Sequence, residues 1–311
     1  MKLERGTDHR HETSMGVMKG PLSAALLLFA AASVGCMVTV DSHSEVQREE
    51  KRFTVTGTPD LRLTTFDGSI QIQSWDKPDV LVEIERRGPT KASLESIEVI
   101  ENQKGDRIDL EVKRPRSESY RVGFHRTPSA NLIVSVPRDV NIVARTGDGS
   151  IKIERVNGRI ELRTGDGSIR AADVSGELEF NTSDGSVGVQ KAHGRLSVDT
   201  GDGSVDVGGM LSAVKLHTGD GSVVYRADPG STMGENWDIT TGDGSVSLYL
   251  PTGFGAELDA HTGDGSIRSD LAGLPPPTRE QSRRTLRGKI GDGGKLLRVR
   301  TGDGAIRLGT S

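Results

Sequence analysis

The sequence predicts an all-β protein whose chain winds into a parallel β-solenoid of about 18-residue coils, with an antiparallel β-meander as the alternative. A motif of Thr, any residue, Asp and Gly occurs nine times, and Ser follows it in eight of these. Between the motifs, aliphatic and polar residues alternate as they do in strands with one buried face. The chain has 40 Gly and 4% aromatic residues, and no long helical period follows residue 52. These observations predict a repetitive β fold punctuated by glycine turns.

Residues 1–35 have the form of a signal peptide. No charged residue lies between Gly20 and Val40, and Lys19 precedes this stretch. A basic start followed by a short apolar segment directs export. The segment closes on Ala-Ser-Val-Gly-Cys36, which resembles the lipobox of bacterial lipoproteins and implies lipidation of Cys36, the single cysteine. The alternative is an uncleaved membrane anchor, because about 20 uncharged residues can cross a bilayer. Both interpretations place the protein outside the cytoplasm, anchored to a membrane of the bacterial cell envelope.

Three further regions follow the signal. Residues 36–52 are mostly polar and lack a clear period, so we expect a tether. Residues 53–145 are expected to form irregular N-terminal coils. Residues 146–311 form the regular repeat, in which the motif aspartates recur at one constant interval from Asp148 to Asp220. The later intervals, which end at Asp243, Asp264 and Asp303, are longer. We interpret them as the same unit with inserted loops, the longest being 271–295.

Strand parity predicts which side chains face the core, because successive side chains point to opposite faces. In the regular coils we expect the threonine that opens each motif to point inward, together with the aliphatic residues at every second position. The corner of each coil is expected at Val156, Val174, Ala192 and Met210, which recur at the same interval as the aspartates. Like residues at like positions favour stacked parallel coils, since a meander pairs unlike strands.

These patterns resemble the DUF4097 "putative adhesin" family. The resemblance rests on the repeated Thr-Gly-Asp-Gly-Ser-Ile units, on VSVPRDVNIVARTGDGSI around Pro137 and on LYLPTGFGAELDAHTGDGSI around Pro251, and it covers residues 50–311. It implies a β-solenoid-like envelope domain, commonly carried by lipoproteins or membrane-anchored proteins. The family lends no catalytic residues.

The motif aspartates are the most conspicuous candidate site. Stacked coils would align their carboxylates, and carboxylate oxygens are ligands for Ca²⁺. Calcium binding is therefore an alternative function, with candidate ligands at Asp148, Asp166, Asp184, Asp202 and Asp220. The structural alternative is that each Asp accepts hydrogen bonds from turn N–H groups while the neighbouring Gly supplies a positive φ. No other cofactor is expected.

The net charge and the motifs argue against two classes of function, nucleic-acid binding and catalysis. The formal net charge of −4 argues against nucleic-acid binding. No histidines have metal-ligand spacing and no nucleophile has an accompanying base, so the chain is predicted not to be an enzyme, with an envelope polysaccharide-active enzyme as the remote alternative. Two basic insertions, 114–128 and 275–289, are candidate contacts for anionic envelope polymers or lipid head groups. In the second insertion the candidates are Arg279, Arg283, Arg284, Arg287 and Lys289. The predicted function is a non-enzymatic, envelope-anchored adhesin or scaffold.

Overall fold

A computed structural model describes residues 45–114, 127–274 and 283–311 of the chain. The described residues belong to one compact unit, His43–Ser311. The predicted signal peptide and Cys36 lie outside the described residues, as do residues 115–126 and the Arg279 part of the second basic insertion.

The described chain contains twenty strands and one short helix. In chain order the elements are β1 (Glu45–Phe53), β2 (Asp60–Thr65), β3 (Ile70–Ser74), β4 (Val80–Gly88), α1 (Lys91–Glu95), β5 (Glu98–Lys104), β6 (Arg107–Lys113), β7 (Ser129–Val136), β8 (Asn141–Arg145), β9 (Ile151–Thr164), β10 (Ile169–Thr182), β11 (Val187–Thr200), β12 (Val205–Thr218), β13 (Val223–Ala227), β14 (Trp237–Thr241), β15 (Val246–Leu250), β16 (Ala256–Thr262), β17 (Ile267–Ser269), β18 (Thr285–Ile290), β19 (Leu296–Thr301) and β20 (Ile306–Thr310).

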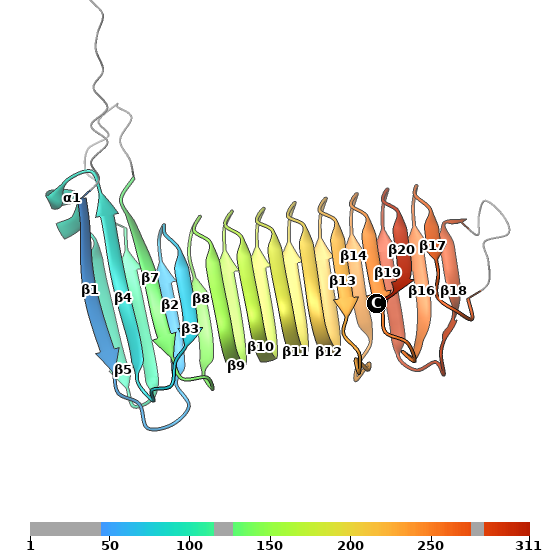
Figure 1. The fold of residues 1–311 in the computed structure, drawn as a ribbon. Coiled ribbons are helices and arrows are strands. Elements are labelled where there is room, and N and C mark those ends of the chain that lie inside the picture. Colours follow the sequence, from blue (N-terminus) through green and yellow to red (C-terminus); the bar gives the residue numbers. More distant parts are fainter. Residues whose placement is uncertain (1–44, 115–126, 275–282) are drawn as a thin grey trace, which may run out of the picture. The chain divides into compact units, whose positions relative to one another are not determined.

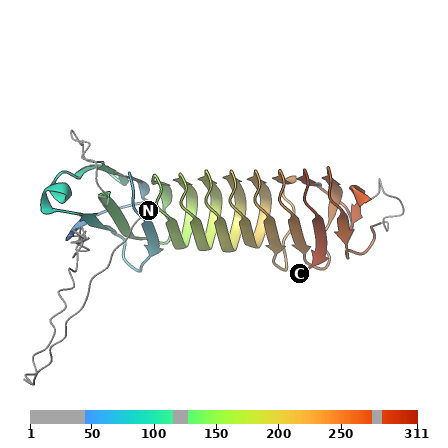
Figure 2. The ribbon, with the colours of Figure 1, turned by 90° about the horizontal axis from the view of Figure 1, so that it is seen from above.

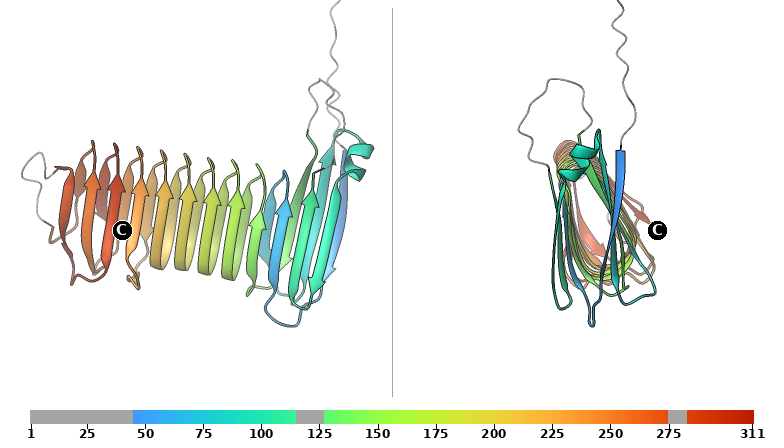
Figure 3. Two further views of the ribbon diagram at one scale, coloured as in Figure 1. Left: turned by 180° about the vertical axis from the view of Figure 1, so that it is seen from behind. Right: turned by 90° about the vertical axis from the view of Figure 1, so that its left-hand side faces the viewer.

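The regular coils are parallel, as the sequence predicts. Strands β9 to β12 are each 14 residues long, and each bends in its middle into a first arm and a second arm. The register between coils equals the interval between motifs, so that Ile151 pairs with Ile169 and Ile169 with Val187. The motif turns lie along one long edge of the unit, which we call the turn edge, and the bends lie along the opposite bend edge (Figure 1). Seen end-on, the two arms of each coil face one another across a narrow interior (Figure 3). The solenoid prediction is confirmed and the meander is not the fold of these coils.

Two conformations recur at the bends of β9, β10 and β11. Arg155, Asp173 and Lys191 have φ between 52° and 57°, and the glycines three positions later also have positive φ. The aliphatic corners Val156, Val174 and Ala192 are buried, as predicted. Met210 is not: it is 40% exposed, and Leu211 is buried instead. The reason is a register irregularity between β11 and β12, where Ala192 pairs with Gly209 and His193 with Met210.

The motif threonines connect successive coils. All nine are buried, which confirms their predicted inward orientation. In the regular coils the Thr hydroxyl donates to the carbonyl of the motif's second Gly in the neighbouring coil: Thr182 Oγ1 lies 3.0 Å from Gly167 O, and Thr218 Oγ1 lies 2.8 Å from Gly203 O. The same hydroxyl accepts from its own turn, as Gly221 N donates to Thr218 Oγ1 at 3.2 Å. Where both bonds are present, as at Thr182 and Thr218, the threonine satisfies buried polar groups in two coils at once.

The glycine after each motif Asp is needed for close approach, not for a positive φ. Only Gly68 among these nine glycines has φ in the left-handed region, so the expected conformational role is wrong for the other eight. A Cβ at Gly167, Gly185 or Gly203 would instead collide with the carbonyl of the equivalent glycine in the preceding coil. The expected Asx turns are also replaced by the threonine contacts. Within the described residues no turn N–H donates to the carboxylates of Asp148, Asp166, Asp184, Asp202 or Asp220.

The coils do not stack in chain order at either end. The coil of β2 and β3 lies between β6 and β7 on one side and β8 and β9 on the other. Likewise, the last coil, β19 and β20, lies between β14 and β15 on one side and β16 and β17 on the other (Figures 1 and 2). The long interval from Asp264 to Asp303 is therefore not one coil with a loop. It contains β18, which pairs antiparallel with β16 inside the region predicted as a loop, and then the return to an inner position. Periodicity cannot specify neighbour order, because every coil presents nearly the same pairing edge.

The N-terminal end departs from the parallel pattern. Residues 45–52, which we assigned to the tether, belong to strand β1 (Glu45–Phe53). This strand is antiparallel to β4, and β4 is antiparallel to β7. On the other arm β5 is antiparallel to β6. The segment 90–101 contains a short helix and the start of strand β5, and Leu94 of the helix is buried. The edge strand β1 carries many charged side chains, which disfavour edge-to-edge association.

Candidate functional site

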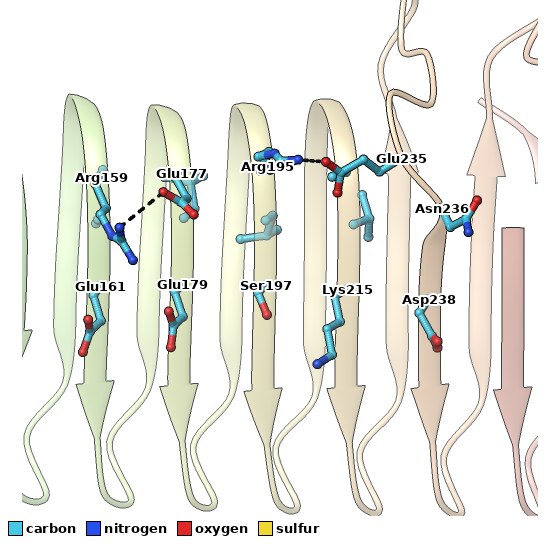
Figure 4. Close-up of a pocket in the computed structure, with 15 residues that line it drawn as sticks. Arg159, Glu161, Glu177, Glu179, Arg195, Ser197, Lys215, Glu235, Asn236 and Asp238 are labelled. Carbon is cyan, nitrogen blue, oxygen red and sulfur yellow. Dashed lines mark ion pairs between the residues drawn. The ribbon is translucent and has the colours of Figure 1, made fainter. Parts of the chain in front are cut away.

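A groove with a volume of about 350 Å³ lies on the outer face of the second arms. It crosses the second arms of β9, β10, β11, β12 and β14, and it is therefore elongated along the direction of coil stacking (Figure 4). Ten polar or charged side chains line it: Arg159, Glu161, Glu177, Glu179, Arg195, Ser197, Lys215, Glu235, Asn236 and Asp238.

The floor of the groove follows directly from strand alternation. The inward neighbours Ile160, Leu178 and Leu196 are buried in the core. The residue that follows each of them in its strand points outward. These outward residues are in register from coil to coil, with Glu161 beside Glu179 and Glu179 beside Ser197. The interior is nearly constant along this stretch, whereas the outward row changes from Glu to Ser to Lys to Asp. The backbone is a repeat, but the surface that it presents is not.

An insertion at the bend edge borders the groove. The coil from Asp220 to Asp243 is longer than the regular coils, and its additional residues form the segment 228–236. Gly234 N donates to Ser212 O at 2.8 Å, which fixes this segment against β12. Glu235 then forms an ion pair with Arg195, two coils away in the stack (Figure 4).

A cluster of aromatic rings fills the core beneath this insertion. Trp237 lies 5.4 Å from Tyr225 and 5.1 Å from Phe254 between ring centroids, and both distances are typical of favourable aromatic pairs. The Tyr225 hydroxyl is buried without a hydrogen-bond partner, and burial raises its pKa. The cluster supports the coil where the regular bend is interrupted.

Ion pairs run along the groove in the stacking direction. Arg145 Nη2 lies 2.8 Å from Glu161 Oε1, and Arg163 contacts both Glu161 at 2.9 Å and Glu179 at 3.1 Å. The hydrogen bond from Arg145 is the main cause of the lowered pKa of Glu161, which burial opposes. Arg159 lies 3.8 Å from Glu177. Lys215 is exposed and has no ion-pair partner in the part of the chain that the structure describes.

The nine motif aspartates form one continuous row on the turn edge. Hydrogen bonds between the turn backbones place them in the spatial order Asp67, Asp148, Asp166, Asp184, Asp202, Asp220, Asp243, Asp303 and Asp264. All are exposed except Asp67, which is half-buried. Arginines pair with the two ends of this row: Arg114 lies 2.5 Å from Asp67, and Arg284 lies 2.7 Å from Asp264. Among the described residues, no three His, Cys, Asp or Glu side chains are grouped so as to hold a metal ion.

Two arginines of the second basic insertion form ion pairs within the protein. Arg284 pairs with Asp264, and Arg287 Nε lies 2.9 Å from Asp259. The carboxyl of Asp259 also contacts Arg300 at 2.5 Å, and the hydrogen bond from Arg300 is the main cause of its lowered pKa. These contacts connect β18 to β16 and β19. Arg283 and Lys289 are exposed, and Arg279 lies outside the described residues.

Sequence reasoning did not find the groove. The residues that line it occupy outward positions, which are unrelated to one another in the sequence. One sequence feature pointed to it, the longer interval between Asp220 and Asp243. Inserted residues cannot fit into a coil of constant length, so they extend from the solenoid and lie against neighbouring coils. Within the described residues, no helix is long and apolar enough to cross a membrane.

The fold and the groove define a solenoid-like β protein with a polar groove across its coils. The chain belongs to the Toastrack DUF4097 family, whose sequence model matches residues 58–309 and whose function is unknown. No curated protein matches the chain.

Three solved structures are similar to it. A "putative cell adhesion protein" from Clostridium sporogenes is 14% identical, with a TM-score of 0.29 over 86% of this chain and 100% of that one. A "putative adhesin" from Bacteroides fragilis is 12% identical, with a TM-score of 0.38 over 84% and 97%. A "putative lipid binding protein" from Parabacteroides distasonis is 14% identical, with a TM-score of 0.48 over 84% and 96%.

Proposed function

We propose that this protein is a non-enzymatic binding scaffold of the bacterial cell envelope, exported and anchored through Cys36, with the second-arm groove as its ligand surface. The observation that carries the proposal is the contrast between a repeated interior and a variable outer row over the same coils. The two glutamates Glu161 and Glu179, the neutral Ser197 and the cationic Lys215 stand on equivalent backbone positions, so charge and size change along the row. A scaffold that holds such a row rigidly suits recognition of an extended partner.

The charges of the groove support binding better than catalysis. A general acid needs a carboxyl whose pKa is raised toward neutrality. Glu161 has the opposite shift, because the guanidinium groups of Arg145 and Arg163 stabilise its ionised form. The groove is also open along its length.

The test is capture of envelope components by the purified exported protein, comparing two substitutions in the same strand. Ser197→Trp places a large ring on the groove floor, and Gln190→Trp places the same ring on the outer face of the first arm of β11. We expect Ser197→Trp to abolish capture of the component that the native protein retains, and Gln190→Trp to leave it unchanged. Capture that survives Ser197→Trp contradicts the assignment of the groove.

A further inference from the structure

We propose that the groove binds a neutral, hydroxyl-rich linear glycan that lies across the strands, along the stacking direction. This inference rests on the proposed function and specifies its ligand. The groove runs over five neighbouring second arms, from Arg159 on β9 to Asp238 on β14. Strands are about 4.8 Å apart, so the occupied length is about 19 Å. A ligand of that length is an oligomer, not a single small molecule.

The backbone of the floor is not available to a ligand. The second arms of β10, β11 and β12 are each paired with a neighbouring strand on both sides. A peptide that binds by adding a strand needs a free edge with unpaired N–H and C=O groups, which this surface lacks. The ligand must therefore be recognised through the outward side chains alone.

The side-chain charges favour a neutral polymer. Three cationic and five carboxylate side chains line the groove: Arg159, Arg195, Lys215, Glu161, Glu177, Glu179, Glu235 and Asp238. Arg145 and Arg163, which pair with Glu161 and Glu179, bring the cluster to five charges of each sign. Because the groove presents charges of both signs along the stack, a polyanion would meet carboxylates and a polycation would meet guanidinium groups.

The hydroxyl groups of a sugar match the hydrogen-bond donors and acceptors that the groove side chains still have available. The Lys215 ammonium has three donors, Ser197 can donate or accept, and ionised carboxylates accept through both oxygens. Asn236 uses its Oδ1 to accept from Leu296 N at 3.0 Å, so its NH₂ group remains for a ligand. A sugar hydroxyl both donates and accepts, and it can therefore bond to each of these groups in turn.

The experiment measures binding of defined oligosaccharides to the full exported protein by calorimetry. The neutral probes are hexasaccharides of β-1,4-glucose, β-1,3-glucose, α-1,4-glucose, β-1,4-mannose and β-1,4-N-acetylglucosamine. The charged probes are oligogalacturonate and oligoglucosamine, and a Gly-Ser peptide of similar length represents an extended polypeptide. We expect one neutral hexasaccharide to bind, with an affinity that changes less than threefold between low and high salt. Ser197→Trp should weaken it at least tenfold, Lys215→Ala should weaken it measurably, and Gln190→Trp should leave it unchanged.

The outcomes separate this inference from the proposed function. If Ser197→Trp abolishes capture from envelope extracts but no neutral hexasaccharide binds, the glycan inference is overturned and the scaffold function stands. Tighter binding of oligogalacturonate, oligoglucosamine or the peptide also overturns it. If Ser197→Trp leaves both capture and oligosaccharide binding intact, the groove is not the ligand surface and both proposals fail.

Discussion

Replacing Gly185 with alanine should disrupt the stacking of the turn edge. A Cβ at Gly185 would lie 2.0 Å from the carbonyl oxygen of Gly167 and 2.8 Å from Thr182 Oγ1. Ordinary van der Waals contact begins at 3.4 Å, so the two turns would have to separate by more than an ångström. The separation breaks the hydrogen bond from Thr182 Oγ1 to Gly167 O and strains the one from Thr200 Oγ1 to Gly185 O, both 3.0 Å long.

The size of the effect follows from these contacts. Overpacking in a tightly packed site costs about 1–3 kcal/mol. Each disrupted hydrogen bond adds about 1 kcal/mol. We therefore expect Gly185→Ala to lower the free energy of unfolding by about 3–5 kcal/mol.

Gly188→Ala is the matched control in the same coil. A Cβ at Gly188 would meet nothing within 4 Å, and its φ lies outside the left-handed region. Alanine there reduces the freedom of the unfolded chain, so we expect a gain of about 0.5 kcal/mol. Denaturant unfolding followed by circular dichroism measures both variants, and hydrogen exchange shows whether the added opening is centred on residues 182–204. Equal stability of the two variants would refute the close-approach explanation of the turn glycines.

Four further predictions address other parts of the chain. Glu85 is buried and accepts hydrogen bonds from Arg48, Arg87 and Asn131, with the Arg48 bond the main cause of its lowered pKa. Its folded pKa lies below the unfolded value, so the stabilisation is complete above about pH 4.5 and is lost as pH falls through the folded pKa. Glu85→Gln should therefore be less stable than the native protein at pH 7 and should lose less stability on acidification, measured by denaturant unfolding at several pH values. Deleting residues 296–311 removes a coil that pairs on both sides, so β16 to β18 should become protease-sensitive while β9 to β12 keep their hydrogen-exchange protection. Cys36→Ser should move the exported protein from the membrane fraction to the soluble fraction, and unchanged membrane retention would favour the uncleaved anchor. Titrating Ca²⁺ to millimolar concentration into chelator-treated protein should give no heat and no shift in Tm, and a saturable shift would establish the aspartate row as a calcium site.

The regular coils were predictable because their sequence repeats at the spacing of the structure. Ile151, Ile169 and Val187 stand one motif interval apart, and parallel stacking is the arrangement that buries such positions against one another. The inward direction of the threonines followed from the same parity. The sequence did not show why each motif turn requires glycine. A glycine required by a positive φ and a glycine required by a close neighbour are identical in sequence, and only the position of the adjacent coil distinguishes them.

Local irregularities were also beyond the sequence pattern. Met210 stands one motif interval after Ala192, yet the shift in pairing around Gly209 exposes its side chain and buries Leu211. Arg284 and Arg287 were predicted as candidate contacts for an anionic partner, and their internal ion pairs were not foreseen. Their carboxylate partners, Asp264 and Asp259, are distant in the chain and come into contact only when β18 folds back on β16.

Alternating hydrophobicity and a fixed repeat length were sufficient to predict the class of fold, most of the buried positions of the regular coils and the row of motif turns on one edge. The order of the coils at the two ends and the existence of the groove became visible only in the folded protein. Both depend on which coils become neighbours and on where an insertion folds. Repeated units with nearly equivalent edges leave that choice to the packing of the whole unit.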